Sequence, residues 1–385
     1  MNIPVEIPFA RPDITDEERN AVTSVLNGHV LTHGPVCKEF ERAFAEMMGG
    51  GSAITVSSCM AALHMSCIHL GFGPGDEVLV PALTHVATVH AVEWVGARPV
   101  FVDCDPGTGN VTADRLEAAI TSRTRGVVLV HFIGIPCDMK AICAMAAARH
   151  LKVVEDCALA VGTRWEGVHA GLWGDCGCFS FYPVKHITTA EGGMFVSRSA
   201  ETAAAINRLR AFGVDRTHTE RSIPGQYDVT SLGLNYRMSE LQAAIGRVQL
   251  SRSGEFLMKR RANFQCWLRA LNDIEDIRIL EREDSVGEQS HYCLVVVLEG
   301  SQRARRDEII MKLKAKGIGT SVYYPQPVPR MTYYRNKYGY DAKQCPNAEE
   351  ISDASIALPL GPHIGEEQIS YMADAFRMIL RERAC

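Results

Sequence analysis

The chain lacks the sequence features of a secreted or membrane-inserted protein. Its first residues, Met1 to Glu6, contain neither a charged n-region nor an apolar h-region, and no apolar run approaches the roughly 18 residues that span a bilayer. It also lacks a block of lysine and arginine, and its formal net charge is −5. We therefore expect a cytoplasmic protein that inserts into no membrane and binds no nucleic acid.

Cysteines at the spacing of a metal site are also lacking. The 13 cysteines are scattered singly, many of them inside apolar stretches, as reduced structural thiols of a cytosolic protein would be. The one close pair, Cys176 and Cys178, is not accompanied by the second Cys or His pair of a zinc site. We therefore expect no bound metal.

Internal repeats and low-complexity tracts are absent, and residues 50–200 instead alternate short apolar strands with helices. The expected strands are Ala53–Val56, Glu77–Pro81, Pro99–Asp103, Gly126–His131, Lys152–Asp156, Cys178–Phe181 and Met194–Ser197. The expected helices between them are Met60–Leu70, Val86–Val95, Ala113–Ile120, Met139–His150 and Ala200–Leu209. This order predicts an α/β fold with a mostly parallel seven-stranded sheet covered by helices, whose active site lies at the carboxyl ends of the strands.

The element order changes near Leu250, which predicts a large domain over residues 1–250 and a smaller α+β domain over 251–385. The second region contains the expected elements Glu255–Leu271, Tyr292–Leu298, Arg303–Lys316 and Glu366–Arg381, with a Tyr/Pro-rich loop over Tyr323–Tyr334. In the first region, Asp215–Ser231 is rich in Arg, Thr and Gly and is the candidate for a mobile active-site loop.

Lys185 follows the apolar stretch Phe179–Val184 and opens a turn rich in Thr and Gly. Desolvation in such a place lowers the pKa of an amine, as a Schiff-base lysine requires, and the small polar neighbours suit an anionic ligand. A surface lysine with a buried stem is the alternative interpretation.

Four further features of the sequence could complete a pyridoxal site around this lysine. Asp156 ends an expected strand and could keep a pyridine nitrogen protonated, although an acidic residue there can also cap a helix. Ser57 and Ser58 close one strand and open a helix, where hydroxyls and free N–H groups bind phosphate, although a plain Ser cap fits equally well. Ser180 could add a hydroxyl, and His85 could stack on a planar cofactor or serve as a core histidine.

Ordered motifs along nearly the whole chain resemble the sugar aminotransferases of the DegT/DnrJ type. These are pyridoxal-phosphate enzymes of the aspartate aminotransferase fold, fold type I, that mostly aminate keto groups of nucleotide-linked sugars. The matching segments include Gly34-Pro35, Val80-Pro81-Ala82, Pro99–Asp103, Val130–Gly134, Glu155-Asp156, Phe179-Ser180-Phe181, Glu191–Met194, Gly233–Met238, Glu240–Ala244 and Leu358-Pro359-Leu360.

The resemblance implies a role for each candidate residue. Lys185 would form the Schiff base with pyridoxal 5'-phosphate and then carry the proton during transamination, and Asp156 would hold the pyridine nitrogen. Ser58 and Ser180 would bind the phosphate, and His85 would stack on the ring. Asn235 would reach the phosphate of the neighbouring subunit, which implies a homodimer with shared active sites.

The chain departs from the family pattern at several positions around the cofactor. Ser58-Cys59-Met60 replaces the usual Ser-Gly-Thr of the phosphate loop, so that a phosphate contact at Met60 would need its backbone N–H. Leu159 replaces a Gln or His that reaches the ring hydroxyl, which removes a hydrogen bond of about 1 kcal/mol. Ala190 and Pro329 also differ from the usual Gly and His. We interpret these changes as signs of an unusual substrate or a divergent branch, because Lys185, Asp156, Ser180 and Asn235 all remain.

The expected reaction is a ping-pong transfer of an amino group from an amino acid, with glutamate the expected donor, to a keto sugar that is most often nucleotide-linked. An aminocyclitol transaminase and a non-catalytic cofactor-binding sensor of the same fold are the alternatives. A hydrolase with Cys59 or Cys157 as nucleophile is a further hypothesis. The candidate substrate residues are Arg216, Arg221, Tyr324 and Arg330.

Overall fold

The computed structural model describes residues 6–215, 222–223, 225–282 and 286–382 of the chain. Its main sheet has seven strands in the order β1-β9-β8-β5-β4-β2-β3. These strands are β1 (Ser52–Val56), β2 (Glu77–Pro81), β3 (Arg98–Val102), β4 (Thr124–Val130), β5 (Lys152–Asp156), β8 (Cys176–Ser180) and β9 (Gly193–Ser197). Only β9 runs antiparallel to its neighbours, so the predicted α/β fold with a mostly parallel sheet is confirmed.

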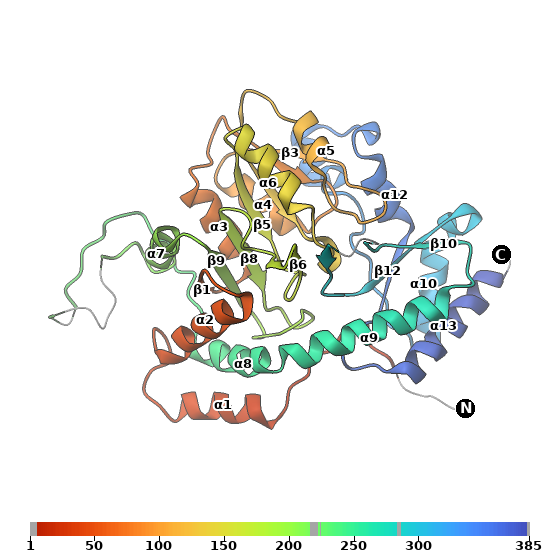
Figure 1. The fold of residues 1–385 in the computed structure, drawn as a ribbon, viewed down its shortest axis with the longest axis horizontal. Coiled ribbons are helices and arrows are strands. Elements are labelled where there is room, and N and C mark those ends of the chain that lie inside the picture. The colour runs from red at the N-terminus through yellow and green to blue at the C-terminus, as the bar shows by residue number, and fades with distance from the viewer. Residues whose placement is uncertain (1–5, 216–221, 224, 283–285, 383–385) are drawn as a thin grey trace.

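Helices cover both faces of the main sheet (Figure 1). Val78 and Val80 of β2 pack in one hydrophobic cluster, whereas Leu79 packs in another with α6. This alternation follows from the two-residue period of a strand, and burial on both faces explains the uninterrupted apolar sequence of the strand. The covering helices include α3 (Cys59–His69), α4 (Val86–Trp94), α5 (Ala113–Ala118), α6 (Met139–Ala148) and α7 (Ala200–Leu209).

Three further helices complete the large part of the molecule. They are α1 (Asp16–Leu26), α2 (Pro35–Met48) and α8 (Glu240–Ser251), and α8 packs against both of the others. Pro35 occupies the first turn of α2, where its missing N–H costs nothing. Thr15 and Glu18 form a capping box at the start of α1. Local signals of these two kinds therefore define where the N-terminal helices begin.

A second sheet forms in the C-terminal part, with antiparallel strands in the order β10-β12-β13. Its strands are β10 (Ile277–Ile279), β12 (Leu294–Leu298) and β13 (Ser355–Leu358), and its helices include α10 (Arg306–Ala315), α11 (Thr332–Tyr338), α12 (Pro346–Ala354) and α13 (Glu366–Arg381). The long helix α9 (Ser253–Leu271) runs from α8 to this sheet (Figure 1).

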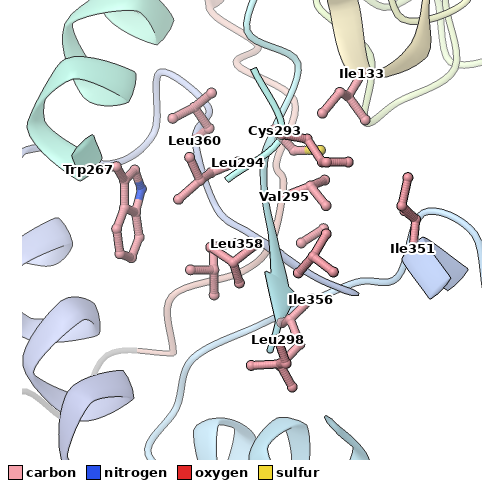
Figure 2. Packing of buried hydrophobic residues seen from close by; sticks show 14 of the residues in the cluster. Ile133, Trp267, Cys293, Leu294, Val295, Leu298, Ile351, Ile356, Leu358 and Leu360 are labelled. Carbon is pink, nitrogen blue, oxygen red and sulfur yellow. The ribbon is translucent and has the colours of Figure 1, made fainter. Parts of the chain in front are cut away.

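The core of the C-terminal part reaches into the first 250 residues. Trp267 of α9 is fully buried beside the second sheet, and Ile133 packs in the same cluster near Cys293 (Figure 2). A small sheet of β6 (Arg164–Trp165), β7 (Val168–His169) and β11 (Gly287–Glu288) also joins the two regions. The domain division near residue 250 stays a prediction. Within the described ranges, no helix has the length and apolar character needed to cross a membrane.

Candidate active site

Asp156 lies at the carboxyl end of β5, and two hydroxyl groups in series support it. Its side chain is buried, Oδ2 accepts a hydrogen bond from Thr88 Oγ1 at 2.8 Å, and Oδ1 accepts one from the Ala158 N–H at 3.0 Å. Because Thr88 gives its proton to the carboxylate, its oxygen accepts from Thr84 Oγ1 at 2.7 Å. The carboxylate is thereby held in one orientation at the edge of the sheet, where a ring nitrogen can meet it.

Lys185 lies in the turn that follows β8, with its side chain partly buried. Its Nζ atom is 5.2 Å from the ring centroid of Tyr292, and among the described residues it makes no hydrogen bond or ion pair. Burial lowers the pKa of the Lys185 amine, whereas the charge of Asp156 acts in the opposite direction. An amine with a lowered pKa and no polar partner fits a residue that bonds a cofactor aldehyde.

The start of α3 forms a cradle for an anion beside these two residues. Ser58 caps the helix, its Oγ accepting from the Ala61 N–H at 3.1 Å, and the first N–H groups of the helix have no partner within it. Gly193 lies against the loop so closely that a Cβ there would come within 2.5 Å of the Ser58 carbonyl carbon. Ser180 pairs with Gly193 across the sheet and is buried. These residues fit a phosphate group.

His85 is the N-cap of α4, and its ring is exposed rather than part of the core. Its Nδ1 accepts from the Ala87 N–H at 3.2 Å, so this nitrogen carries no proton. The ring meets Tyr324 edge to face at 5.8 Å, and Tyr324 also approaches Phe132 at 6.2 Å. Burial raises the pKa of Tyr324 well above its usual value, so it stays a neutral phenol. The structure thus brings His85 and Tyr324 together as an aromatic wall.

The other candidate residues are paired with other groups or lie outside the described residues. Asn235 is exposed, and its Oδ1 accepts from Arg237 Nε at 2.9 Å. Arg330 forms a two-pronged ion pair with Asp353, so its charge is already neutralised. Arg216 and Arg221 lie outside the described residues.

Two of the residues that depart from the family pattern, Cys59 and Met60, lie at the start of α3. Cys59 is the first residue of α3 and is buried, and its sulfur lies 3.8 Å from Asp156 Oδ1. Met60 follows it and is partly buried. Leu159 is buried, and its carbonyl accepts from Ser290 Oγ at 3.2 Å. Cys59 thus places sulfur where a glycine would leave space beside the carboxylate.

The thiols do not resemble nucleophiles or metal ligands. Burial raises the pKa of Cys59 and Cys157 well above that of a free thiol, so both stay protonated, which argues against the hydrolase hypothesis. The twelve cysteines of the described residues are free.

One buried group, His131, Glu155 and Cys157, has ligand-type atoms close together. Glu155 accepts from the N–H groups of Gly171, Trp173 and Gly174 and from His131 Nε2, and His131 Nδ1 accepts from a backbone N–H. These polar atoms are already used in structural hydrogen bonds. They leave no basis for a metal proposal.

Two contact residues of the centre were not predicted from the sequence in these roles. Thr88 lies within a helix, and its position three residues after the N-cap His85 is the only local signal that it faces the sheet edge. Tyr292 reaches Lys185 from the start of β12, more than 100 residues away in sequence, and nothing in the local pattern indicates that contact.

Comparisons with known proteins agree with this geometry. Residues 12–377 match the DegT/DnrJ/EryC1/StrS aminotransferase family. An uncharacterized protein of Methanocaldococcus jannaschii is 34% identical over 380 residues, covering 98% of each chain. A putative sugar aminotransferase of Streptococcus pneumoniae, solved in its PMP form, is 30% identical with a TM-score of 0.91, covering 97% of this chain and 98% of that one. The aminotransferase TlmJ of Streptoalloteichus hindustanus is 31% identical with a TM-score of 0.90, covering 97% and 99%.

Three groups of the centre match pyridoxal 5'-phosphate. The Lys185 amine can bond its aldehyde, the Asp156 carboxylate can accept from its ring nitrogen, and the start of α3 can bind its phosphate. Structures of the matched S. pneumoniae protein include a PLP form as well as the PMP form. The chain therefore belongs to the DegT/DnrJ/EryC1/StrS aminotransferase family and is a transaminase that depends on pyridoxal phosphate.

Proposed function

We propose that this enzyme transfers an amino group from L-glutamate to a keto sugar carried on a nucleotide. The observation that supports it best is the pairing of a hydrogen-bonded Asp156 carboxylate with an unpaired Lys185 amine at one edge of the sheet. A sugar as acceptor is supported by the solved relatives, among them the putative sugar aminotransferase of S. pneumoniae. The nucleotide and the glutamate donor rest on the family resemblance.

Each residue of the centre has a defined task in this proposal. When bound, pyridoxal phosphate supplies the electron sink that makes the α-hydrogen of an amino acid acidic. Asp156 keeps the pyridine nitrogen protonated, and the lowered pKa of Lys185 favours the free amine that accepts the α-proton of the donor. Ser58, Ser180 and the N–H groups of Cys59 and Met60 bind the phosphate, and the exposed ring of His85 stacks on the cofactor.

The substrate sites are proposed from two partly buried polar residues. Arg237 lies beside Asn235 and makes no ion pair among the described residues, so it can meet the negative charge of a sugar diphosphate. Tyr324 offers a neutral hydroxyl next to His85. We do not assign Arg330 to the substrate, because its guanidinium already holds Asp353. A cytoplasmic location stays a prediction.

The decisive experiment separates the two half-reactions. The holoenzyme, mixed with L-glutamate and no acceptor, is expected to release one equivalent of 2-oxoglutarate per site and to change the visible absorption of its cofactor once. The enzyme that has reacted with glutamate is then separated from the small molecules and mixed in turn with nucleotide-linked keto sugars, free keto sugars and keto-cyclitols. If a nucleotide-linked sugar restores the visible absorption that the holoenzyme had before glutamate was added, the proposal is supported. Return only with a cyclitol favours the aminocyclitol alternative, and no change with any amino acid favours a sensor.

We also propose a homodimer in which each site uses Asn235 of the other subunit. The segment around Asn235 supports this, since it exposes apolar side chains that a partner would cover: Leu232 is 94% exposed and Val229 56%. Inactive Lys185→Ala and Asn235→Asp variants are unfolded together, refolded and assayed. If sites are shared, mixed dimers contain one intact site, and about a quarter of the wild-type activity returns. If each site is built from one subunit, the mixture stays inactive.

A further inference from the structure

Arg260 is a buried cation without a counter-ion. It lies on α9, its side chain is 4% exposed, and it forms no ion pair among the described residues. Its Nη1 donates to the carbonyl oxygens of Tyr292 at 2.7 Å and His291 at 3.4 Å, and its Nε has no hydrogen-bond partner. A buried guanidinium that carbonyl groups alone support is costly to the fold. Such a cost is expected where the charge serves the active site.

Tyr292 connects this cation to Lys185. The ring centroid of Tyr292 lies 6.0 Å from Arg260 Cζ and 5.2 Å from Lys185 Nζ. Tyr292 is buried and is fixed at three points: its N–H donates to Ile133, its carbonyl accepts from Arg260, and its hydroxyl pairs with that of Tyr323 at 2.8 Å. One aromatic ring therefore contacts two cations and has little freedom to move.

We propose that Arg260 is a positioning residue for the reaction at Lys185: it holds Tyr292 against the amine, and its own charge disfavours a second positive charge there. The inference rests on the proposed role of Lys185. The Arg260 hydrogen bonds fix the backbone at residues 291–292, just before β12, so the amine meets the ring at one place. The lack of a counter-ion leaves the charge of Arg260 unshielded toward Lys185.

The other titratable groups around Lys185 leave Asp156 as the opposing charge. They are Cys59 on α3, Cys293 next to Tyr292, His85 at the start of α4, and His186. Burial raises the pKa of both thiols, so they stay neutral, and burial together with Arg260 lowers the pKa of His186 well below its usual value. Asp156 therefore favours the charged form of the Lys185 amine, whereas burial and, in this proposal, the charge of Arg260 disfavour it.

The test compares three variants of the holoenzyme. Arg260→Met removes the charge at similar length, Arg260→Lys keeps the charge, and Arg261→Met is the control, because Arg261 is the exposed neighbour on the same helix. The measurement is the pH midpoint of the cofactor's visible absorption, which follows the proton at Lys185. Because both groups lie close to the same Tyr292 ring centroid, at 6.0 and 5.2 Å, their charges are at most about 11 Å apart. At that limit, an effective dielectric of about 20 gives a shift of the midpoint by about one pH unit.

Removing a nearby positive charge favours the protonated form, so Arg260→Met is expected to raise the midpoint by about one unit. Arg260→Lys and Arg261→Met are expected to leave it within about 0.3 units. The inference is overturned if Arg260→Met leaves the midpoint unchanged, or if Arg260→Lys raises it as far as Arg260→Met does. Should Arg260→Met not fold, Arg260→Gln takes its place, because its amide can still donate to the Tyr292 carbonyl.

The same data distinguish this inference from the proposed function. If the wild-type protein shows no spectral change with any amino donor, the proposed transamination fails, whatever the Arg260 variants do. If the wild type reacts with glutamate and only the midpoint of Arg260→Met stays constant, the positioning role fails while the transamination stands.

Discussion

Replacing Thr88 by Val should lower the rate of transamination more than replacing Thr84 by Val. Both substitutions exchange a hydroxyl for a methyl group at a fully buried position. Thr88 Oγ1 donates to the Asp156 carboxylate at 2.8 Å, whereas Thr84 reaches only Thr88. The two variants therefore remove successive members of one chain of hydrogen bonds.

The expected magnitudes follow from the charge of the acceptor. A hydrogen bond to a charged group contributes about 1.5–3 kcal/mol, and a neutral one about 0.5–1.5 kcal/mol. If the loss falls on the transition state, kcat decreases about 10- to 150-fold for Thr88→Val and no more than about tenfold for Thr84→Val. Both proteins should bind the cofactor, because the residues at the start of α3 are unchanged.

The assay is steady-state kcat with glutamate and the acceptor found in the screen, together with cofactor retention on dialysis and the thermal unfolding midpoint. The midpoints show whether the two variants lose similar stability. If Thr84→Val lowers kcat as much as Thr88→Val at equal cofactor occupancy, then Thr88 does not act by orienting Asp156, and the reasoning is refuted.

Three further predictions concern the cofactor site and the fold around it. Lys185→Ala should abolish turnover. Reduction with borohydride should attach the cofactor to the peptide that contains Lys185 in the wild type, and to no such peptide in the variant. If mass spectrometry finds the cofactor on another lysine, the assignment is wrong. Gly193→Ala should weaken cofactor binding at least tenfold in a fluorescence titration, because the new Cβ would lie 2.6 Å from the Cys59 nitrogen; unchanged affinity would show that the loop can move. Hydrogen bonds from Thr15 and Gln249 outweigh burial and lower the pKa of the buried Glu18 carboxyl to about 2, so the ionised form stabilises the fold above pH 4.5 and this contribution disappears as the pH falls toward 2. Glu18→Gln should therefore lower the unfolding free energy by up to about 2 kcal/mol at pH 7, after allowance for solvent screening, and by progressively less below pH 4.5. Urea unfolding of the wild type and the variant at pH 7 and pH 3.5 measures this loss. A loss that is the same at both pH values would contradict the prediction.

The sequence predicts the elements best where the apolar residues recur with a regular strand or helix period. The strands Glu77–Pro81 and Lys152–Asp156 and the helices Ala200–Leu209 and Glu366–Arg381 have the predicted bounds. The strand before Lys185 was expected at Cys178–Phe181 but is Cys176–Ser180. Phe181 is as apolar as a strand residue, but its N–H bonds to Gly192 in the turn, so hydrophobicity alone could not place the strand end.

Contacts between distant segments were harder to predict than the elements. Asp156 and Ser180 could be placed at the active edge because parallel strands share their carboxyl ends. The ion pair of Arg330 with Asp353 and the contact of Tyr292 with Lys185 depend on how the C-terminal part folds against the main sheet, which no local pattern records. Seven of the residues that we predicted to bind the cofactor lie in the centre described above, and they are Ser58, Cys59, Met60, His85, Asp156, Ser180 and Lys185. The contact of Asn235 with the phosphate of the neighbouring subunit stays a prediction.

Glu155 and Asp156 are neighbours on β5, yet the pleat of the strand sends their carboxylates to opposite sides of the sheet. Glu155 fastens the turn at residues 171–174 and His131, whereas Asp156 lies against Thr88 and the start of α3. A slip of the strand by one residue would exchange the two groups and leave the pyridine nitrogen without its partner. The hydrogen bonds of Glu155 therefore fix the register of β5, and with it the position of the Asp156 carboxylate.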